Sequence, residues 1–175
     1  ADARTTTTTW HPTLRVSTQI VRPGQTVDMT YDTEGRLLTR TLTDTQNQTV
    51  PYSTNGNTRV WTYTYHPTFG LVTSIDGPRT GDTTTFTYAV NGDLATTTNA
   101  EGHVTTIVSR DARGLPTRIE DPNGVDTVLA YDERGRLTSR TVESSQGNAV
   151  TSFTYDDASQ LTSVTLPNGS SLDYE

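Results

Sequence analysis

Three histidines are the side chains of this sequence best suited to binding a transition metal. His11, His66 and His103 lie far apart in sequence, and each stands beside an expected turn or strand end. A zinc site built from three histidines would require the fold to bring them together, so we interpret them as solvated turn residues. The chain has no cysteine, which excludes a disulfide framework, a thiolate nucleophile and a cysteine-based zinc site.

The acidic residues could support glycoside hydrolysis if two carboxylates flanked a groove, and Asp132-Glu133 and Asp156-Asp157 could take up calcium. However, nearly all acids recur at turn positions, where the capping of backbone amides accounts for them. Neither an Asp-x-Asp-x-Asp-Gly loop nor a Gly-x-Ser-x-Gly sequence occurs. We therefore predict no catalytic residue, no cofactor, no cofactor-binding residue and no metal site, and we expect that the chain is not an enzyme.

The turns that carry these acids repeat along the chain. Tyr31-Asp32-Thr33-Glu34-Gly35-Arg36-Leu37 recurs as Tyr131-Asp132-Glu133-Arg134-Gly135-Arg136-Leu137, with looser copies that begin at Tyr88 and Tyr155. Two further copies, which begin at Tyr65 and Arg110, are degenerate, and Tyr174-Glu175 opens another. The repeat starts therefore lie near residues 31, 65, 88, 110, 131, 155 and 174, and such periodicity is typical of repeat architectures.

A second turn lies within each unit, as in Asp121-Pro122-Asn123-Gly124 and Leu166-Pro167-Asn168-Gly169. Each unit is therefore about two strands and two turns long. We divide the chain into an N-terminal lead and first strand (1–27) and a repeat region (28–175), with a long loop or extra hairpin at 43–59. In the lead, Thr5 to Thr9 is interpreted as an edge strand or a flexible segment, and the alternation of Leu14, Val16, Thr18 and Ile20 predicts a strand.

Local chemistry explains these turns. Asp can accept hydrogen bonds from amides two residues on, and Gly four positions after the Tyr can adopt a positive φ, which closes a hairpin of the type I plus bulge class. Between turns, Phe153 and Tyr155 fall on one face of their strand, and Thr lies opposite. Leu161 and Val164 have opposite parity, which suggests a bulge or a sheet covered on both faces. The prediction is an all-β antiparallel meander of hairpins that forms a wide curled sheet.

The composition agrees with a sheet. The sequence contains 39 Thr among 175 residues, a β-branched type that favours strands. The formal net charge is −7, which argues against nucleic acid or an anionic membrane as a partner, and no apolar stretch is long enough to span a membrane. The start at Ala1 to Arg4, without an initiator Met, indicates a piece of a longer protein.

The Tyr-Asp-x-x-Gly-Arg-Leu units and their Pro-Asn-Gly turns resemble the YD repeats of the Rhs/YD-repeat family, which includes bacterial Rhs polymorphic toxins, toxin-complex shell proteins and the teneurins. The resemblance covers Tyr31 to Glu175. It implies a segment of a β-cocoon-like shell, in bacteria commonly one that encloses a cytotoxic C-terminal domain. Asp121-Pro122-Asn123-Gly124 is similar to the family's self-cleavage element, but its register is that of an ordinary repeat turn.

We therefore expect a non-catalytic structural shell segment, secreted or delivered outside the producing bacterial cell, which helps to encapsulate a toxin domain before delivery. Its expected partners are the remaining repeats of the shell and the enclosed toxin. Open sheet edges would also allow self-association. The alternative is a cell-surface adhesin or carbohydrate-binding stalk, in which Trp10 and Trp61 would hold glycans, although packing of these rings within the sheet is favoured.

Overall fold

The computed structural model describes residues 5–49 and 51–174. Ala1 to Arg4 and Glu175, on which the expectations of a longer protein and of a further repeat copy depend, lie outside the described residues. Fifteen strands and no helix occur in the described residues, and the predicted all-β antiparallel meander is confirmed. Accordingly, no helix in these ranges is long and apolar enough to cross a bilayer.

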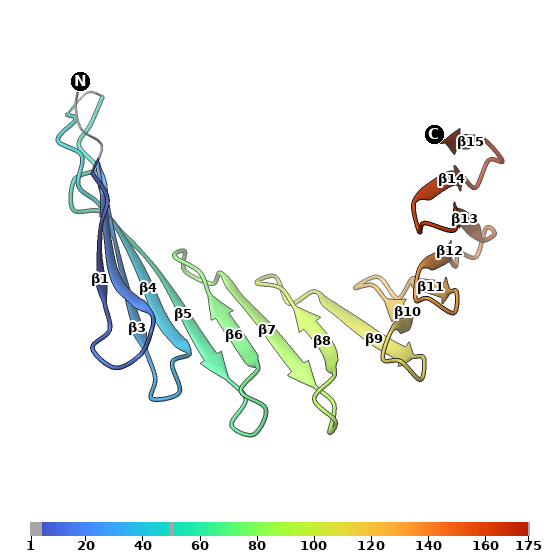
Figure 1. Cartoon of the computed structure of the whole chain (residues 1–175), viewed down its shortest axis with the longest axis horizontal. Coiled ribbons are helices and arrows are strands. Elements are labelled where there is room, and N and C mark those ends of the chain that lie inside the picture. Colours follow the sequence, from blue (N-terminus) through green and yellow to red (C-terminus); the bar gives the residue numbers. More distant parts are fainter. Residues whose placement is uncertain (1–4, 50, 175) are drawn as a thin grey trace. The chain divides into compact units, whose positions relative to one another are not determined.

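The chain forms two compact units that divide after Phe86, and Figure 1 shows the strands of each following the order of the chain. In the first unit each strand pairs antiparallel with the next. Its strands are β1 (Thr7–Trp10), β2 (Ser17–Arg22), β3 (Gln25–Tyr31), β4 (Leu37–Asp44), β5 (Thr58–Tyr65), β6 (Val72–Asp76) and β7 (Thr83–Tyr88), the last of which contains the division.

The second unit follows the same rule from β8 to β15. Its strands are β8 (Leu94–Thr98), β9 (Val104–Arg110), β10 (Pro116–Glu120), β11 (Asp126–Tyr131), β12 (Leu137–Val142), β13 (Ala149–Tyr155), β14 (Leu161–Thr165) and β15 (Ser171–Asp173).

The lead differs from the expectation at one point. The strand expected through Leu14, Val16, Thr18 and Ile20 begins only at Ser17, because the preceding residues form the loop between β1 and β2. Within the Thr run, residues from Thr7 onward form β1, so the edge-strand interpretation is confirmed for that part.

A β-bulge beside four of the repeat tyrosines explains the irregular spacing of the returning strands. Tyr155 pairs with Leu161 and Thr154 with Ser163, so Thr162 is an extra residue. Equivalent shifts follow Tyr31, Tyr65 and Tyr131. A bulge of one residue reverses the alternation, and Leu161 and Val164 therefore lie on the same face. Of the two explanations that the spacing allowed, the bulge is the one observed.

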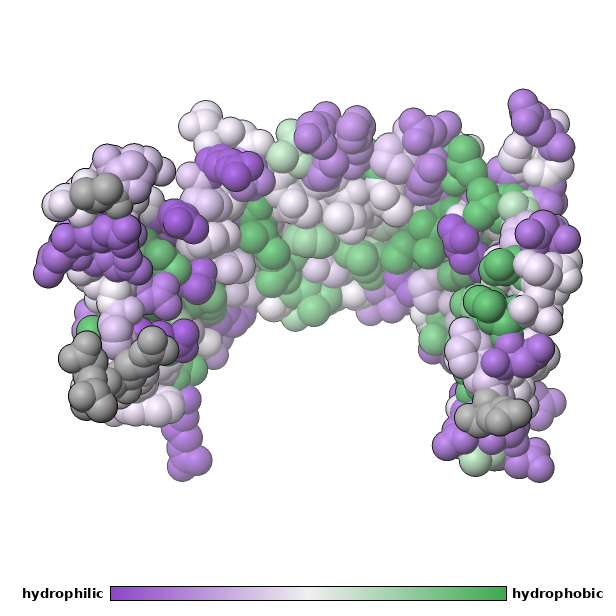
Figure 2. Space-filling view, turned by 90° about the horizontal axis from the view of Figure 1, so that it is seen from above, coloured by the Kyte–Doolittle hydropathy of each residue, from purple (hydrophilic) through white to green (hydrophobic). Residues whose placement is uncertain are grey.

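With the bulges in place, the two faces of the sheet have distinct compositions. We call one the aromatic face; in the first unit it carries Val27, Met29, Tyr31, Leu37, Leu42, Trp61, Tyr63, Tyr65, Val72 and Ile75. In the second unit it carries Ile107, Ile119, Leu129, Tyr131, Leu137, Val142, Phe153, Tyr155, Leu161 and Val164. Figure 2 shows hydrophobic residues gathered in a band and hydrophilic residues bordering it.

The opposite face, which we call the hydroxyl face, is lined by Thr and Ser. Cross-strand hydroxyl pairs form a ladder there, with oxygen to oxygen distances of 2.6 Å for Thr30 and Thr39, 2.8 Å for Thr64 and Thr73, and 3.0 Å for Thr154 and Thr162. Such pairs stabilise neighbouring strands without an apolar layer above them.

Neither unit has a conventional core. Val27, 7% exposed, is the one buried apolar residue in the described part of the chain. A single sheet without a covering layer leaves most side chains half-exposed, so its cohesion must come from contacts between neighbouring hairpins.

The segment between β4 and β5 makes the repeat unit that begins at Tyr31 longer than the other repeat units. Its ends are tied to the sheet, since the Asp44 amide donates to the Asn57 carbonyl at 2.9 Å and the Thr54 hydroxyl donates to Asp44 Oδ2 at 2.6 Å. The described residues of 45–57 contain no strand, and the segment closes as a loop.

Candidate functional site

Most repeat turns are capped by the side chain of their first residue. In the turn after β11, Asp132 Oδ1 accepts hydrogen bonds from the amides of Arg134 and Arg136 at 2.9 Å each, and Asp132 Oδ2 accepts one from Arg136 Nε at 2.6 Å. The Gly135 amide donates to the Asp132 carbonyl at 3.0 Å, with φ of 79° at the glycine. This is the predicted type I turn with a bulge.

These hydrogen bonds keep the Asp132 carboxylate ionised. The backbone amide of Arg136, followed by the Arg136 side chain, lowers the pKa of Asp132 below its ordinary value. Asp132 therefore stays ionised and fully engaged, which suits a turn cap and not a general acid.

Asp121-Pro122-Asn123-Gly124 has the same geometry. Asp121 Oδ1 accepts from the amides of Asn123 at 2.8 Å and Val125 at 2.9 Å, and the Gly124 amide donates back to the Asp121 carbonyl. The Val125 amide lowers the pKa of Asp121 most strongly. The segment that is similar to a cleavage element is thus built as an ordinary repeat turn.

Two histidines perform the role of the turn aspartate. His66 Nδ1 accepts from the amides of Thr68 and Phe69 at 3.2 and 3.3 Å, and His11 Nδ1 accepts from those of Thr13 and Leu14 at 3.3 and 3.1 Å. The third, His103, closes its turn through its own amide, which donates to Asn99 Oδ1 at 2.9 Å. Within the described residues, no group of three His, Asp or Glu is arranged to hold a metal ion.

The His11 turn is a repeat copy that sequence reasoning missed. Trp10-His11-Pro12-Thr13 has the same pattern as Tyr65-His66-Pro67-Thr68. Both precede a strand that is offset by a bulge, with Trp10 paired to Ser17 as Tyr65 is paired to Val72. The shared His-Pro-Thr triplet was the signal that could have revealed it.

The repeat tyrosine joins adjacent hairpins. Its hydroxyl donates to the backbone carbonyl at the start of the preceding returning strand, at distances of 2.7 to 2.9 Å. The pairs are Tyr31 with Ser17, Tyr65 with Leu37, Tyr131 with Pro116 and Tyr155 with Leu137. We call these hydrogen bonds the tyrosine tethers.

The degenerate unit that begins at Arg110 keeps the tether with a different donor. Arg110 Nη2 donates to the Leu94 carbonyl at 2.7 Å, and Nη1 donates to the Gly114 carbonyl at 2.9 Å. Its Nε also lies 3.9 Å from the Asp93 carboxylate. A guanidinium thus supplies the donor that a phenol supplies elsewhere.

Turn arginines reach across to the next hairpin. The guanidinium carbon of Arg36 lies 5.0 Å from the centre of the Tyr65 ring, and that of Arg136 lies 4.7 Å from the Tyr155 ring. Arg113 Nη1 donates to the Asp132 and Glu133 carbonyls at 2.8 and 3.1 Å. In these three places a hairpin is tied to the next at its turn as well as along its strands.

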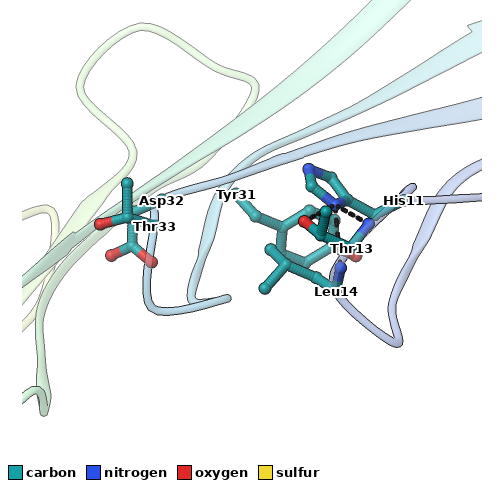
Figure 3. A pocket seen from close by; sticks show the side chains of 6 residues that line it. All are labelled: His11, Thr13, Leu14, Tyr31, Asp32 and Thr33. Carbon is teal, nitrogen blue, oxygen red and sulfur yellow. Dashed lines mark hydrogen bonds between the residues drawn. The ribbon is translucent and has the colours of Figure 1, made fainter.

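Two surface pockets lie between adjacent turns of the sheet. The larger one, about 490 Å³, lies between the His11 turn and the Asp32 turn, and Figure 3 shows His11, Thr13 and Leu14 beside Tyr31. The groups around it are already engaged, because His11 Nδ1 caps its turn and the Tyr31 hydroxyl donates to Ser17. The hollow therefore offers no ready nucleophile and base pair.

A second hollow, about 310 Å³, contains both acidic pairs that were considered for calcium, Asp132-Glu133 and Asp156-Asp157. Arginines stand between them, since Arg136 Nη1 donates to the Asp156 carbonyl at 3.1 Å and Arg134 Nη1 to the Asp157 carbonyl at 3.0 Å. Arg136 thus links the Asp132 carboxylate of one turn to the backbone of the next turn.

The two tryptophans have different environments. Trp10, on the edge strand β1, is 63% exposed. Trp61 is half-buried, and the guanidinium carbon of Arg40 lies 4.7 Å from the centre of its ring. Trp61 is therefore packed within the aromatic face, at least on the side that Arg40 covers.

Residues 110–146 match the family model described as RHS Repeat. This segment is an RHS repeat. The matched segment starts at Arg110 and contains three capped turns, those of Asp111, Asp121 and Asp132. The comparison with curated proteins found no match.

A solved structure shows this fold within a larger protein. The crystal structure of TcdB2-TccC3 without its hypervariable C-terminal region matches 93% of the chain at 18% identity, with a TM-score of 0.72. The chain spans 9% of the length of that protein. A structure of the Photorhabdus luminescens Tc holotoxin pore matches 86% of the chain and 11% of the other protein at 17% identity, with a TM-score of 0.38.

Proposed function

We propose that these RHS repeats form part of the wall of a shell that encloses a polypeptide cargo before its delivery outside the producing bacterial cell. The observation that carries the proposal is the chain of tethers between hairpins. Tyrosine or arginine donors join successive hairpins in both units, which gives a continuous sheet that needs no core. The fold shared with TcdB2-TccC3 supports the same role.

The wall acts by physical confinement and not by catalysis. The titratable groups of the repeat turns are committed to capping, and the pKa values of Asp121 and Asp132 are lowered by the amides that they accept. The partners of this segment are then further repeats on either side and the enclosed toxin domain.

The hydroxyl face is the one that we assign to the cargo side. Its threonine ladder is interrupted by acids, Asp28 and Asp76 in the first unit and Glu120 and Asp126 in the second. Arg118, the one arginine in the described strands of this face, is neutralised by Glu143 and lies 3.3 Å from Asp126. A polar, acidic lining would hold a basic or incompletely folded chain without strong adhesion, although Val21, Val60, Val108 and Val150 are exposed there.

Protease protection of the natural polypeptide that contains this segment would test the proposal. In the intact protein, a nonspecific protease is expected to leave a fragment that contains no repeats, because the wall shields it. Replacement of Tyr65 and Tyr131 by Ala should open the wall and expose that fragment, whereas Tyr52→Ala, at a residue 71% exposed, should not. Equal digestion of the fragment in all three proteins would overturn the proposal.

A further inference from the structure

Arginines bridge successive repeat turns in the second unit. Arg113 Nη1 donates to the carbonyls of Asp132 and Glu133, the first and second residues of the next turn, at 2.8 and 3.1 Å. The first and second carbonyls of the following turn also accept from guanidinium groups, in the pairs Arg136 with Asp156 at 3.1 Å and Arg134 with Asp157 at 3.0 Å. The two carbonyls that open a repeat turn are thus a recurring acceptor pair for guanidinium groups from the preceding turn.

The repeat tyrosine that precedes a turn adds a stacking surface. The guanidinium carbon of Arg136 lies 4.7 Å from the centre of the Tyr155 ring, and in the first unit that of Arg36 lies 5.0 Å from the Tyr65 ring. Arg136 therefore contacts both the Tyr155 ring and the Asp156 carbonyl with one side chain. A guanidinium suits both contacts, because it is planar, stacks on aromatic rings and presents five donors in a rigid fork.

The hollow of about 490 Å³ between the His11 turn and the Asp32 turn has the same kind of wall. Tyr31, Asp32 and Thr33 line it together with residues of the His11 turn (Figure 3). They correspond to the repeat tyrosine and the first two turn residues that meet guanidinium groups elsewhere. No arginine is among the described residues that line this hollow.

A threonine stands where the bridging arginine would originate. Thr13 donates its amide to the His11 ring at 3.3 Å. Arg113 donates its amide to the Asp111 carboxylate at 2.9 Å and so holds the same place in its own turn. Arg15, the arginine closest to Thr13 in the sequence, is exposed and does not line the hollow. The His11 turn thus leaves open the hollow that an arginine would bridge.

The acceptors of this hollow keep capacity for further donors. Within the described residues, the Asp32 carbonyl accepts one hydrogen bond, from the Gly35 amide at 3.1 Å, and the Thr33 carbonyl accepts none. Both can still accept, because a carbonyl oxygen has two lone pairs. The same turn carries two carboxylates, those of Asp32 and Glu34, against the one guanidinium of Arg36. Its local field therefore also favours a cation.

We propose that the hollow between the His11 and Asp32 turns binds a guanidinium group that these turns do not supply, such as that of an arginine from another molecule. The guanidinium would stack on the Tyr31 ring and donate to the carbonyls of Asp32 and Thr33, as the arginines of other turns do. An alkylammonium ion fits this site less well, because it is a compact point charge without a planar fork. The inference goes beyond the proposed function, because ligand binding at a turn does not depend on an enclosed cargo.

The test uses the 175-residue chain and the peptide acetyl-Gly-Arg-Gly-amide, followed by the amide chemical shifts of the protein in NMR spectra. Matched peptides carry lysine, or citrulline, which keeps the planar shape without the charge. The arginine peptide should give saturable shifts at residues 13–14 and 31–36, with a dissociation constant of about 1 mM or lower. The lysine and citrulline peptides should bind about tenfold more weakly.

Arginine amide, without the flanking residues, distinguishes two sources of the ligand. Affinity equal to that of the peptide would identify a small guanidinium compound as a sufficient ligand. Tighter binding of the peptide would assign the site to an arginine side chain of a polypeptide. Both results support a guanidinium site.

Thr13→Arg is the decisive variant, because it supplies the missing guanidinium from the place that Arg113 holds in its turn. It should weaken peptide binding about tenfold or more, since an intramolecular group competes at a high effective concentration. Thr68→Arg is the matched control, because it makes the same change at the same place of the other His-Pro-Thr turn, and it should leave binding unchanged. Should Thr13→Arg fail to keep the circular dichroism spectrum of the parent, Glu34→Gln replaces it and should weaken binding about threefold.

Three results would overturn the proposal. One is an absence of saturable shifts up to about 10 mM of the arginine peptide. Another is equal binding of the arginine and citrulline peptides, or equal losses in Thr13→Arg and Thr68→Arg. The third is binding that occurs only after Arg15→Ala, which would show that the chain fills the hollow with its own arginine. None of these results bears on the protease protection of the cargo, so the two proposals fail separately.

Discussion

Arg110 Nη2 lies 2.7 Å from the Leu94 carbonyl and donates to it where other units use a tyrosine hydroxyl. The equivalent bond joins Tyr131 to Pro116 in the next unit at 2.9 Å. The tether between hairpins is therefore preserved although the residue that makes it has changed. This equivalence indicates that the hydrogen bond, and not the aromatic ring, is the requirement at this position.

Removal of the Arg110 donor should destabilise the second unit. Arg110→Leu leaves the Leu94 carbonyl without this donor, and we expect a loss of about 1–2 kcal/mol in the free energy of unfolding. Arg110→Tyr should recover most of that loss. Urea denaturation followed by circular dichroism measures both variants, with Arg79→Leu as the exposed control. Equal destabilisation by Tyr and Leu would refute the equivalence.

Deletion of a single tether hydroxyl should have a measurable effect in the first unit. Tyr65→Phe removes the 2.7 Å bond to the Leu37 carbonyl but keeps the ring under Arg36, so the expected loss is about 0.5–1.5 kcal/mol. Both tryptophans lie in this unit, so their fluorescence reports on its unfolding. Tyr52→Phe is the control, and a loss as large there would contradict the interpretation.

Ser159 should be improved by glycine. It occupies the turn position that is glycine in the other copies and has φ of 69°, which is strained for a residue with a Cβ. Ser159→Gly relieves that strain and loses only long contacts of 3.3 and 3.4 Å from Arg136 and Arg134. The net gain should be about 0.5–1 kcal/mol in urea denaturation. A lower denaturation midpoint would show that these contacts outweigh the strain.

Because the turn aspartates are capped as carboxylates, we expect the folding stability of the chain to fall in acid. Because the pKa of Asp132 is lowered in the folded chain from its ordinary value of 3.8, its stabilising contribution is present above that value and is lost as the pH falls through the folded pKa. Asp132→Asn should therefore be less stable than the parent at pH 6, and the difference should shrink towards pH 2.5, in urea denaturation series across that range. A constant difference would exclude this origin.

Local chemistry made the turns predictable from the sequence. Asp132 and Gly135 need nothing beyond their own loop, and their spacing alone indicated the observed turn. The site of each bulge was not predictable, because it depends on which residue of the returning strand pairs with the tyrosine. Without the bulge, Leu161 and Val164 seem to face opposite ways, and the composition of the two faces stays hidden.

The candidate site was predicted less completely, because its hydrogen bonds join residues of different repeat units. Nothing in the local sequence of Arg110 indicates that it reaches Leu94, sixteen residues earlier. The capping role of His11 is similarly concealed, because imidazole nitrogen replaces the carboxylate oxygen that the motif leads one to expect. Sequence reasoning therefore found the structural roles that follow from residue type, such as the Asp caps. It missed the roles that follow from position in the sheet, such as that of Arg110.

Most hairpins carry their own capping residue, a residue with positive φ and their own offset residue. Duplication or loss of a whole hairpin pair would consequently leave every remaining strand in phase with its neighbours. Recombination between copies of such a gene can therefore lengthen or shorten the sheet, and the long loop between β4 and β5 falls where the chain turns back.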